Sequence, residues 1–180
     1  MRKVTYGAAC SLDGYLARTD DGVDWLHWSD DVRRITGEYW PRVDAILMGR
    51  KTYDVARKAG TGAYPGVTNY LFSRTLHDDP EPNVNLVRDE ATVFVRDLKS
   101  QAGREICLMG GGELAQSLLD AGLVDEVGVN VHPILLGSGK PLFLPLQTQH
   151  TLELIKTEPL SGGCIYALYR IVGKLGVGQQ

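Results

Sequence analysis

Three places in the sequence combine small residues with cations in the way that a bound phosphate requires. The first is Gly49-Arg50-Lys51-Thr52, where an apolar run stops at a glycine and a helical pattern begins with two cations. Cations at a helix N-terminus oppose the helix dipole, at a cost of about 0.3–1 kcal/mol each. A phosphate bound there would accept helix N–H groups and neutralise both charges. The alternative is that Arg50 and Lys51 are simply solvated.

The second place is the turn Gly110-Gly111-Gly112-Glu113-Leu114, which links an apolar run to a helical pattern. Glycines at such a turn let the backbone approach a ligand closely. The turn also fits a loose dinucleotide fingerprint, but it comes too late in the chain for a second βαβ half to follow, which argues against a Rossmann domain. The alternative is a tight turn that only packs a helix on a strand.

The third place is Ser73-Arg74, directly after a β-like run. A guanidinium beside a hydroxyl suits a phosphate monoester, such as the 2′-phosphate that distinguishes NADPH from NADH. A surface turn is the commoner explanation for this pair alone. A dinucleotide that lies across one edge of a sheet would use all three places.

The elements that must position these residues alternate in type. Apolar runs predict strands over residues 4–10, 44–48, 67–72, 105–109, 124–131, 152–157 and 164–171. Helical spacing predicts helices over 26–40, 51–57, 92–101 and 113–121, and the polar stretch 77–85 predicts a surface loop. The pattern indicates a three-layer α/β fold with a mostly parallel central sheet and an antiparallel hairpin at its C-terminal edge. Ligands of such sheets bind at the carboxyl ends of the strands.

Composition sets the class of protein. The chain has 180 residues, 43% of them hydrophobic, with a net charge of −3. We expect one domain over residues 1–172 and a flexible tail over 173–180. The net negative charge argues against a nucleic-acid partner, and no apolar run is long enough to span a membrane. Three widely spaced cysteines and no signal peptide predict buried thiols in the cytoplasm, and no metal site is expected.

Two further stretches carry a resemblance to a known family. Residues 11–17 (SLDGYLA) and 131–143 (VHPILLGSGKPLF), together with the glycine turns, resemble the dihydrofolate reductase-like superfamily, in particular the branch that contains the reductase domain of riboflavin biosynthesis. The resemblance covers roughly residues 2–172. It implies a dihydrofolate reductase-like fold, NADPH as cofactor, hydride transfer to a small heterocycle, and a homodimer. The apolar stretch 135–146 also favours a partner copy.

The resemblance implies roles for single residues. The cofactor phosphates would contact Gly49, Arg50, Lys51 and Thr52. The 2′-phosphate would lie at Ser73 and Arg74. The pyrophosphate would lie on the 110–114 turn, and the nicotinamide beside residues 13–17, including Leu16.

The substrate side is expected around Asp24–Asp31. Hydride transfer needs a proton as well, and Asp30 follows Trp25 at the spacing that resembles the acid of dihydrofolate reductases. The alternative is that Ser29 or Asp30 caps a helix, which would make Asp30 a poor acid. Trp25 and Trp28 are candidates for stacking on the substrate or for core packing.

Three more residues are considered near the substrate. Asp13 contacts the substrate or forms an Asx turn with Gly14. Tyr53 is expected to face the pocket, whereas His132 is expected to make a structural hydrogen bond. The sequence offers no evident arginine for a folate glutamate tail and no basic anchor for a ribose phosphate.

The sequence therefore predicts an NADPH-dependent reductase of a pterin- or pyrimidine-like small molecule, with Asp30 or a water as proton donor. The first alternative is a nucleotide-binding module of the same fold without turnover. The second is a phosphate-sugar enzyme that uses the same turns without nicotinamide.

Overall fold

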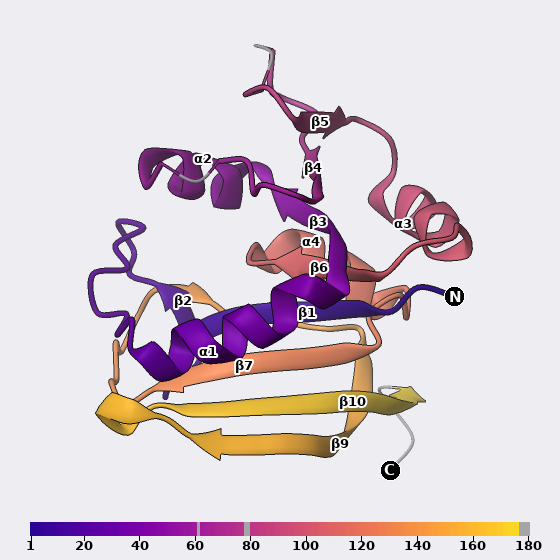
Figure 1. Cartoon of the computed structure of the whole chain (residues 1–180). Helices are drawn as coiled ribbons and strands as arrows, with labels where there is room; N and C mark the ends of the chain where they lie inside the picture. The colour runs from indigo at the N-terminus through magenta and orange to yellow at the C-terminus, as the bar shows by residue number, and fades with distance from the viewer. Residues whose placement is uncertain (61, 78–79, 177–180) are drawn as a thin grey trace.

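The computed structural model describes residues 1–60, 62–77 and 80–176, and its centre is an eight-stranded sheet in the order β5-β4-β3-β6-β1-β7-β10-β9 (Figure 1). The strands are β1 (Val4–Ser11), β3 (Val43–Gly49), β4 (Thr68–Phe72), β5 (Val84–Val87), β6 (Glu105–Met109), β7 (Glu126–His132), β9 (Thr148–Pro159) and β10 (Ile165–Gly176). The pairs from β5 to β7 are parallel, and β10 is antiparallel to both β7 and β9. The expected sheet with its C-terminal antiparallel hairpin is confirmed.

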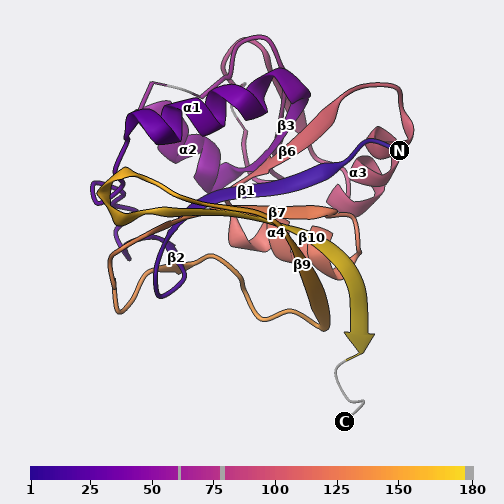
Figure 2. The ribbon, with the colours of Figure 1, turned by 60° about the horizontal axis from the view of Figure 1, so that its bottom comes forward.

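Helices cover both faces of this sheet. They are α1 (Asp30–Tyr39), α2 (Arg50–Lys58), α3 (Ala91–Ser100) and α4 (Gly112–Asp120). Figure 2 shows α1 and α2 above the sheet and α4 below it. Within the described residues, no helix is both long and apolar enough to cross a membrane.

The central strands are apolar on both sides because helices bury both of their faces. Along β3, Ala45 and Leu47 belong to the core cluster that includes α3 and α4. Ile46 and Met48 belong to the cluster on the other face, which includes Tyr53 of α2. This two-sided burial explains the unbroken apolar run that predicted the strand.

A second, small sheet lies near the carboxyl end of β1. It pairs β2 (Tyr15–Ala17) with β8 (Lys140–Pro141) in antiparallel fashion. It joins the segment after β1 to the segment after β7.

Several element boundaries differ from the sequence-based expectation, and three of the differences change which residues belong to the sheet or to a helix. Val84–Val87 forms the edge strand β5, where we expected a loop to continue to residue 85, because Val84 and Val87 are buried against the sheet. Residues 78 and 79 of that loop lie outside the described residues. Helix α1 begins at Asp30 rather than at residue 26, because the Ser29 hydroxyl caps it.

The third difference is at the C-terminus. Strand β10 continues to Gly176, which pairs with Thr148, so residues 173–176 belong to the sheet rather than to the expected tail. The backbone bonds of a long hairpin hold these residues, although their sequence has little apolar surface to bury. Residues 177–180 lie outside the described part of the chain.

Candidate cofactor and substrate site

The three phosphate-compatible turns lie side by side at one edge of the sheet. Strands β4, β3 and β6 are neighbours, with Gly49 beside Phe72 and Met48 beside Met109 in the parallel register. All three strands therefore end at nearly the same level, and their turns open toward the same side. The structure brings together the groups that the sequence placed at separate strand ends.

Two helix N-termini meet at this edge, and each has a glycine as its N-cap residue. Gly49 and Gly111 are the N-cap residues of α2 and α4, and neither helix receives a side-chain cap hydrogen bond. Gly110 and Gly111 have φ of 53° and 71°, a region that disfavours other residues. A Cβ on Gly111 would lie 3.3 Å from Thr52 Oγ1 and 4.0 Å from Gly49 N, so the two turns are in close contact. The first-turn N–H groups of both helices remain for an anionic ligand.

Each cation at this edge contacts a carboxylate in the structure. Arg50 Nε lies 2.8 Å from Asp54, Lys51 Nζ lies 3.4 Å from Glu113, and an Arg74 nitrogen lies 3.0 Å from Glu90. All three pairs are partly or largely exposed to solvent. Exposed pairs of this kind are weak, about 0–1 kcal/mol, so a phosphate can compete for these cations.

Several predicted cofactor residues use their side chains within the fold. Leu114 is buried in the core cluster under α4. The Ser73 hydroxyl accepts hydrogen bonds from the N–H groups of Thr75 and Leu76 at 3.3 and 3.1 Å, which fixes the turn after β4. Leu16, in the middle of β2, packs against the same core cluster as Leu114.

Asp13 joins the segment after β1 to the segment after β7. Its carboxylate accepts hydrogen bonds from the Ser11 hydroxyl at 2.6 Å and from the N–H groups of Leu136 and Gly137 at 3.1 and 2.7 Å. The Ser11 bond, followed by the two backbone bonds, lowers the pKa of Asp13. These hydrogen bonds favour the ionised form of Asp13 and indicate a structural role, while its expected catalytic role stays a prediction.

Asp30 is the first residue of α1 and projects into solvent. Its side chain is 98% exposed and pairs with Arg33 one turn later. Ser29, not Asp30, is the cap, because the Ser29 hydroxyl accepts from Val32 N. The Asp30 carboxyl therefore lies in solvent and not in a closed pocket.

The two tryptophans of the substrate side have different environments. The Trp25 ring packs edge-on against the His132 imidazole with the ring centres 5.5 Å apart, whereas Trp28 is 63% exposed. The Trp25 indole N–H is buried and makes no hydrogen bond within the described residues. Trp25 therefore packs as part of the fold, and Trp28 alone presents its ring to solvent.

His132 is buried at the carboxyl end of β7. Its Nδ1 accepts a hydrogen bond from His27 N at 3.3 Å, and its Nε2 lies 3.3 Å from the Asn130 amide. Burial, and then the proximity of His27, lower the pKa of His132, so the imidazole is neutral near neutral pH. The expected structural hydrogen bond is present.

Tyr53 does not face a pocket. Its side chain is 1% exposed, and its hydroxyl accepts a hydrogen bond from Glu81 N at 2.9 Å. The ring packs in the core under α2 and the hydroxyl is hydrogen-bonded, which corrects the expectation of a substrate contact.

The comparisons with known proteins agree with this geometry. The model of the RibD C-terminal domain family matches residues 2–166. The chain belongs to this family. It is 28% identical to the uncharacterized protein YyaP of Bacillus subtilis, over 93% of this chain and 94% of that protein. It is 31% identical to YwjB of the same organism, over 87% and 91% of the two chains.

Solved structures of other proteins show the same fold. A crystal structure of a putative riboflavin biosynthesis protein from Shewanella sp. PV-4 has a TM-score of 0.83 and 29% identity, over 96% of this chain and all of that one. The deaminase/5-amino-6-(5-phosphoribosylamino)uracil reductase of Thermotoga maritima has a TM-score of 0.68 and 17% identity, over 95% of this chain and 57% of that one. Dihydrofolate reductase from Enterococcus faecalis, complexed with NADP(H), has a TM-score of 0.69 and 12% identity, over 95% and 97%. The resemblance to riboflavin-biosynthesis reductases and to the dihydrofolate reductase-like fold is thereby confirmed, and membership of this family supports a reductase.

Sequence reasoning missed two polar residues that shape this RibD-family site. Ser11 is buried, and its hydroxyl donates to Asp13 while accepting from Tyr15 N at 2.9 Å. Asn130 lies beside His132 on β7. The signal for Ser11 was its place two residues before Asp13, a spacing that suits a local side-chain hydrogen bond.

Proposed function

We propose that this protein is an NADPH-dependent oxidoreductase that transfers a hydride to a small pterin- or pyrimidine-like heterocycle. The observation that carries the proposal is the meeting of two glycine-capped helix N-termini, beside Arg50 and Lys51, at level strand ends. Uncapped helix N–H groups and neighbouring cations suit a pyrophosphate. The glycines fit such a ligand, since a Cβ at Gly49 would occupy open space and one at Gly111 would crowd the turn.

The chain's own residues divide the task between them. The first-turn N–H groups of α2 and α4 would hold the pyrophosphate, and Arg50 and Lys51 would exchange their carboxylate partners for phosphate oxygens. Arg74, beside the Ser73 turn, would hold the 2′-phosphate. NADPH supplies the hydride when it is bound. The Asp13 clamp would keep the segment after β1 in place beside the reacting rings.

The proton is proposed to come from water. Asp13 is held ionised by three hydrogen bonds, and the Asp30 carboxyl lies in solvent beside Arg33. Neither carboxylate lies in a closed, dry pocket of the kind that positions a general acid. Solvent reaches the Asp30 end of α1 freely and can protonate the reduced ring.

Titration with NADPH and NADH tests the proposal directly. We expect NADPH to bind more tightly than NADH. In a panel of reducible heterocycles, we expect the protein to reduce at least one with oxidation of NADPH. Arg50→Ala should weaken NADPH about tenfold or more, because a charge-assisted hydrogen bond contributes about 1.5–3 kcal/mol. Its melting temperature should hardly change, because the Arg50–Asp54 pair is partly exposed. Binding without turnover would favour the nucleotide-binding module, and absence of NADPH binding would reject both.

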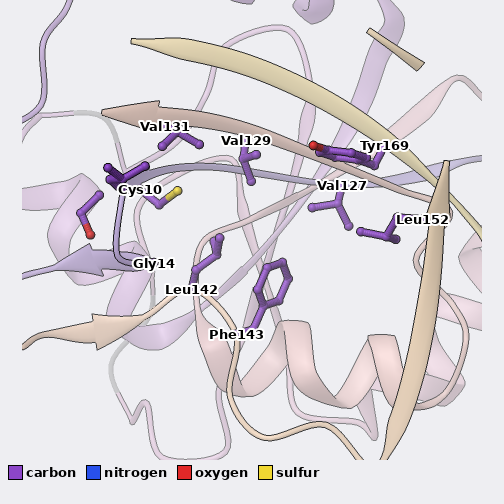
Figure 3. A pocket seen from close by; sticks show the side chains of 11 residues that line it. Cys10, Gly14, Val127, Val129, Val131, Leu142, Phe143, Leu152 and Tyr169 are labelled. Atoms are coloured by element: carbon purple, nitrogen blue, oxygen red, sulfur yellow. The ribbon is translucent and has the colours of Figure 1, made fainter. Parts of the chain in front are cut away.

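We also propose that the protein is a homodimer. A pocket of about 360 Å³ lies between β7, β10 and the segment after β8, and Figure 3 shows Val127, Phe143 and Leu152 around it. Phe143 and Leu152 are each 42% exposed, and Leu154 on the edge strand β9 is also exposed. A second copy would cover this apolar surface. Sedimentation should give about twice 19.7 kDa, and Leu152→Lys should give the monomer; a wild-type monomer would contradict the proposal.

The three cysteines support the proposed cytoplasmic location. Cys10, Cys107 and Cys164 are buried free thiols. Burial raises the pKa of Cys10 and of Cys107 to about 11 in each case, so neither is a reactive thiolate. Free thiols of this kind persist in a reducing compartment.

A further inference from the structure

We infer that the substrate of this reductase is an uncharged, flat heterocycle that carries neither a phosphate nor a carboxylate tail. The inference rests on the proposed function and deepens it. It concerns the substrate rim, defined as residues 12–33 and 132–140, which lie on the other side of β1 from the phosphate turns.

Direct contacts join the parts of the substrate rim. Leu12 N donates to Ile134 O at 2.9 Å, which ties the segment after β1 to the segment after β7. The Trp25 ring and His27 N both contact His132, so the loop between β2 and α1 closes over the end of β7. Figure 1 shows this loop beside the start of α1, at the edge where β7 ends. A substrate that enters beside β1 must pass these residues.

The charge of this rim is negative. Residues 18–33 contain five aspartates and only two arginines. Arg18 pairs with Asp24, Arg33 pairs with Asp30, and Lys140 of β8 lies 3.6 Å from Asp21. Every lysine and arginine of the substrate rim therefore has a carboxylate partner, and aspartates remain in excess. A phosphate or carboxylate on the substrate would be repelled there.

The remaining surface of the rim is apolar or neutral. Leu12, Trp28 and Leu135 are 64%, 63% and 70% exposed, which is unusual for such large apolar side chains. His132 offers no positive charge, because burial lowers its pKa. Apolar side chains and an exposed indole suit the face of a flat ring. The rim therefore fits the ring of a substrate and not an anionic appendage.

This property would separate the protein from a relative of the same fold. The name of the Thermotoga maritima reductase specifies a phosphoribosylamino compound, whose substrate carries a phosphate. In the present chain the cations at the strand ends, Arg50, Lys51 and Arg74, lie on the proposed NADPH side. A substrate phosphate could use them only by displacing the cofactor.

Matched substrate pairs test the inference. The first pair is a diamino-ribosylamino-pyrimidinone with and without its 5′-phosphate, and the second is 7,8-dihydropterin and 7,8-dihydrofolate. With NADPH, we expect kcat/KM to be at least about tenfold higher for the uncharged member of each pair, with the difference shrinking as salt rises. Equal or better use of the anionic member overturns the inference.

A charge variant sharpens the test. Asp24→Asn removes one rim carboxylate and frees Arg18, so kcat/KM for the phosphorylated member should rise about threefold or more relative to the uncharged one. The matched control is Glu153→Gln, which neutralises an exposed, arginine-paired carboxylate on β9 and should leave the ratio unchanged. An unchanged ratio in Asp24→Asn counts against the electrostatic part of the inference.

Binding measurements cover the case of low turnover. Quenching of tryptophan fluorescence by each member of the pairs, in the presence of NADPH, should show tighter binding of the uncharged member. No preference, or no binding of either member, overturns the inference. Failure to bind NADPH would instead reject the proposed function, so the two failures are distinguishable.

Discussion

Two halves of one sheet edge have opposite chemistry. On the β3–β6 side, glycine-capped helices and the cations Arg50 and Lys51 gather at level strand ends. On the β1–β7 side, the segments that follow the two strands carry aspartates and exposed apolar side chains, and His132 is buried and neutral. The negative charge on the β1–β7 side would repel the phosphates that suit the β3–β6 side. The comparison teaches that charge could orient the proposed dinucleotide and a small uncharged ring within one site.

The strongest way to break this comparison is to place a negative charge among the glycine turns. Gly49 is the N-cap of α2 at φ −81°, and a Cβ there meets nothing within 4 Å. Gly49→Asp should leave the fold intact or stabilise it by a few tenths of a kcal/mol, since Asp caps helices slightly better than Gly. The same carboxylate should weaken NADPH binding about a hundredfold, because like charges in contact cost several kcal/mol.

Calorimetric titration and thermal unfolding measure both effects on the same sample. Gly49→Ser is the matched control, because it adds a neutral cap of nearly the same size. NADPH affinity in Gly49→Asp equal to that in Gly49→Ser would place the pyrophosphate elsewhere.

The next test asks whether the cationic half extends to β4. Arg74 pairs with Glu90 and is largely exposed. Arg74→Ala should lower NADPH affinity about tenfold and leave NADH affinity unchanged, because only NADPH carries the 2′-phosphate. Arg170→Ala, which breaks the exposed pair with Glu153 on the C-terminal hairpin, is the control. A parallel loss for both cofactors would move the 2′-phosphate away from Arg74.

A smaller effect is expected at the start of α1. Asp30→Asn should change kcat less than about threefold, because the Asp30 carboxylate projects into solvent beside Arg33 and is not enclosed with a substrate. General acid catalysis by a positioned group contributes about 10²–10⁴-fold. A hundredfold loss of kcat, with KM unchanged, would therefore return Asp30 to the role of proton donor.

The smallest expected effect is on the pH dependence of stability and concerns His132 on the β1–β7 side. The pKa of His132 is lowered in the folded protein, so the unfolded chain binds more protons as pH falls. His132 should therefore reduce stability progressively as pH drops below about 6.5, the ordinary histidine value. His132→Asn keeps an acceptor for His27 N and should flatten this part of the pH dependence. Urea unfolding of both proteins between pH 7.5 and 5 measures the difference; parallel curves would show that His132 does not titrate as described.

The fold could be read from the sequence because its elements are locally marked. The two-sided apolar runs of β3 and β6 and the glycine after each of them fixed where strands end and helices begin. β5 escaped detection because four residues in a polar stretch give too short a signal. Residues 173–176 escaped for another reason: their place in β10 depends on backbone bonds to β9, which apolar patterning does not reveal.

Only the phosphate side of the candidate site could be predicted from the sequence in this way. Phosphate-compatible turns consist of local residues, so Gly49–Thr52 and Gly110–Leu114 were visible as motifs. On the substrate side, the role of each aspartate depends on whether its carboxylate makes hydrogen bonds within the fold. Asp13 and Asp30 look alike in the sequence, yet Asp13 is bonded to Leu136 and Gly137, more than 120 residues away, while Asp30 faces solvent.

The sequence by itself determined the strand-turn-helix units, their order, and the cations and glycines that each turn carries, because these features arise from neighbours in the chain. Only the tertiary structure decided that β4, β3 and β6 end level with one another, that Tyr53 is enclosed in the core, and that Asp13 is a clamp. The physical reason is that burial and hydrogen-bond partners set a side chain's charge and reach. Those partners come from strands that are distant in sequence and adjacent in the sheet.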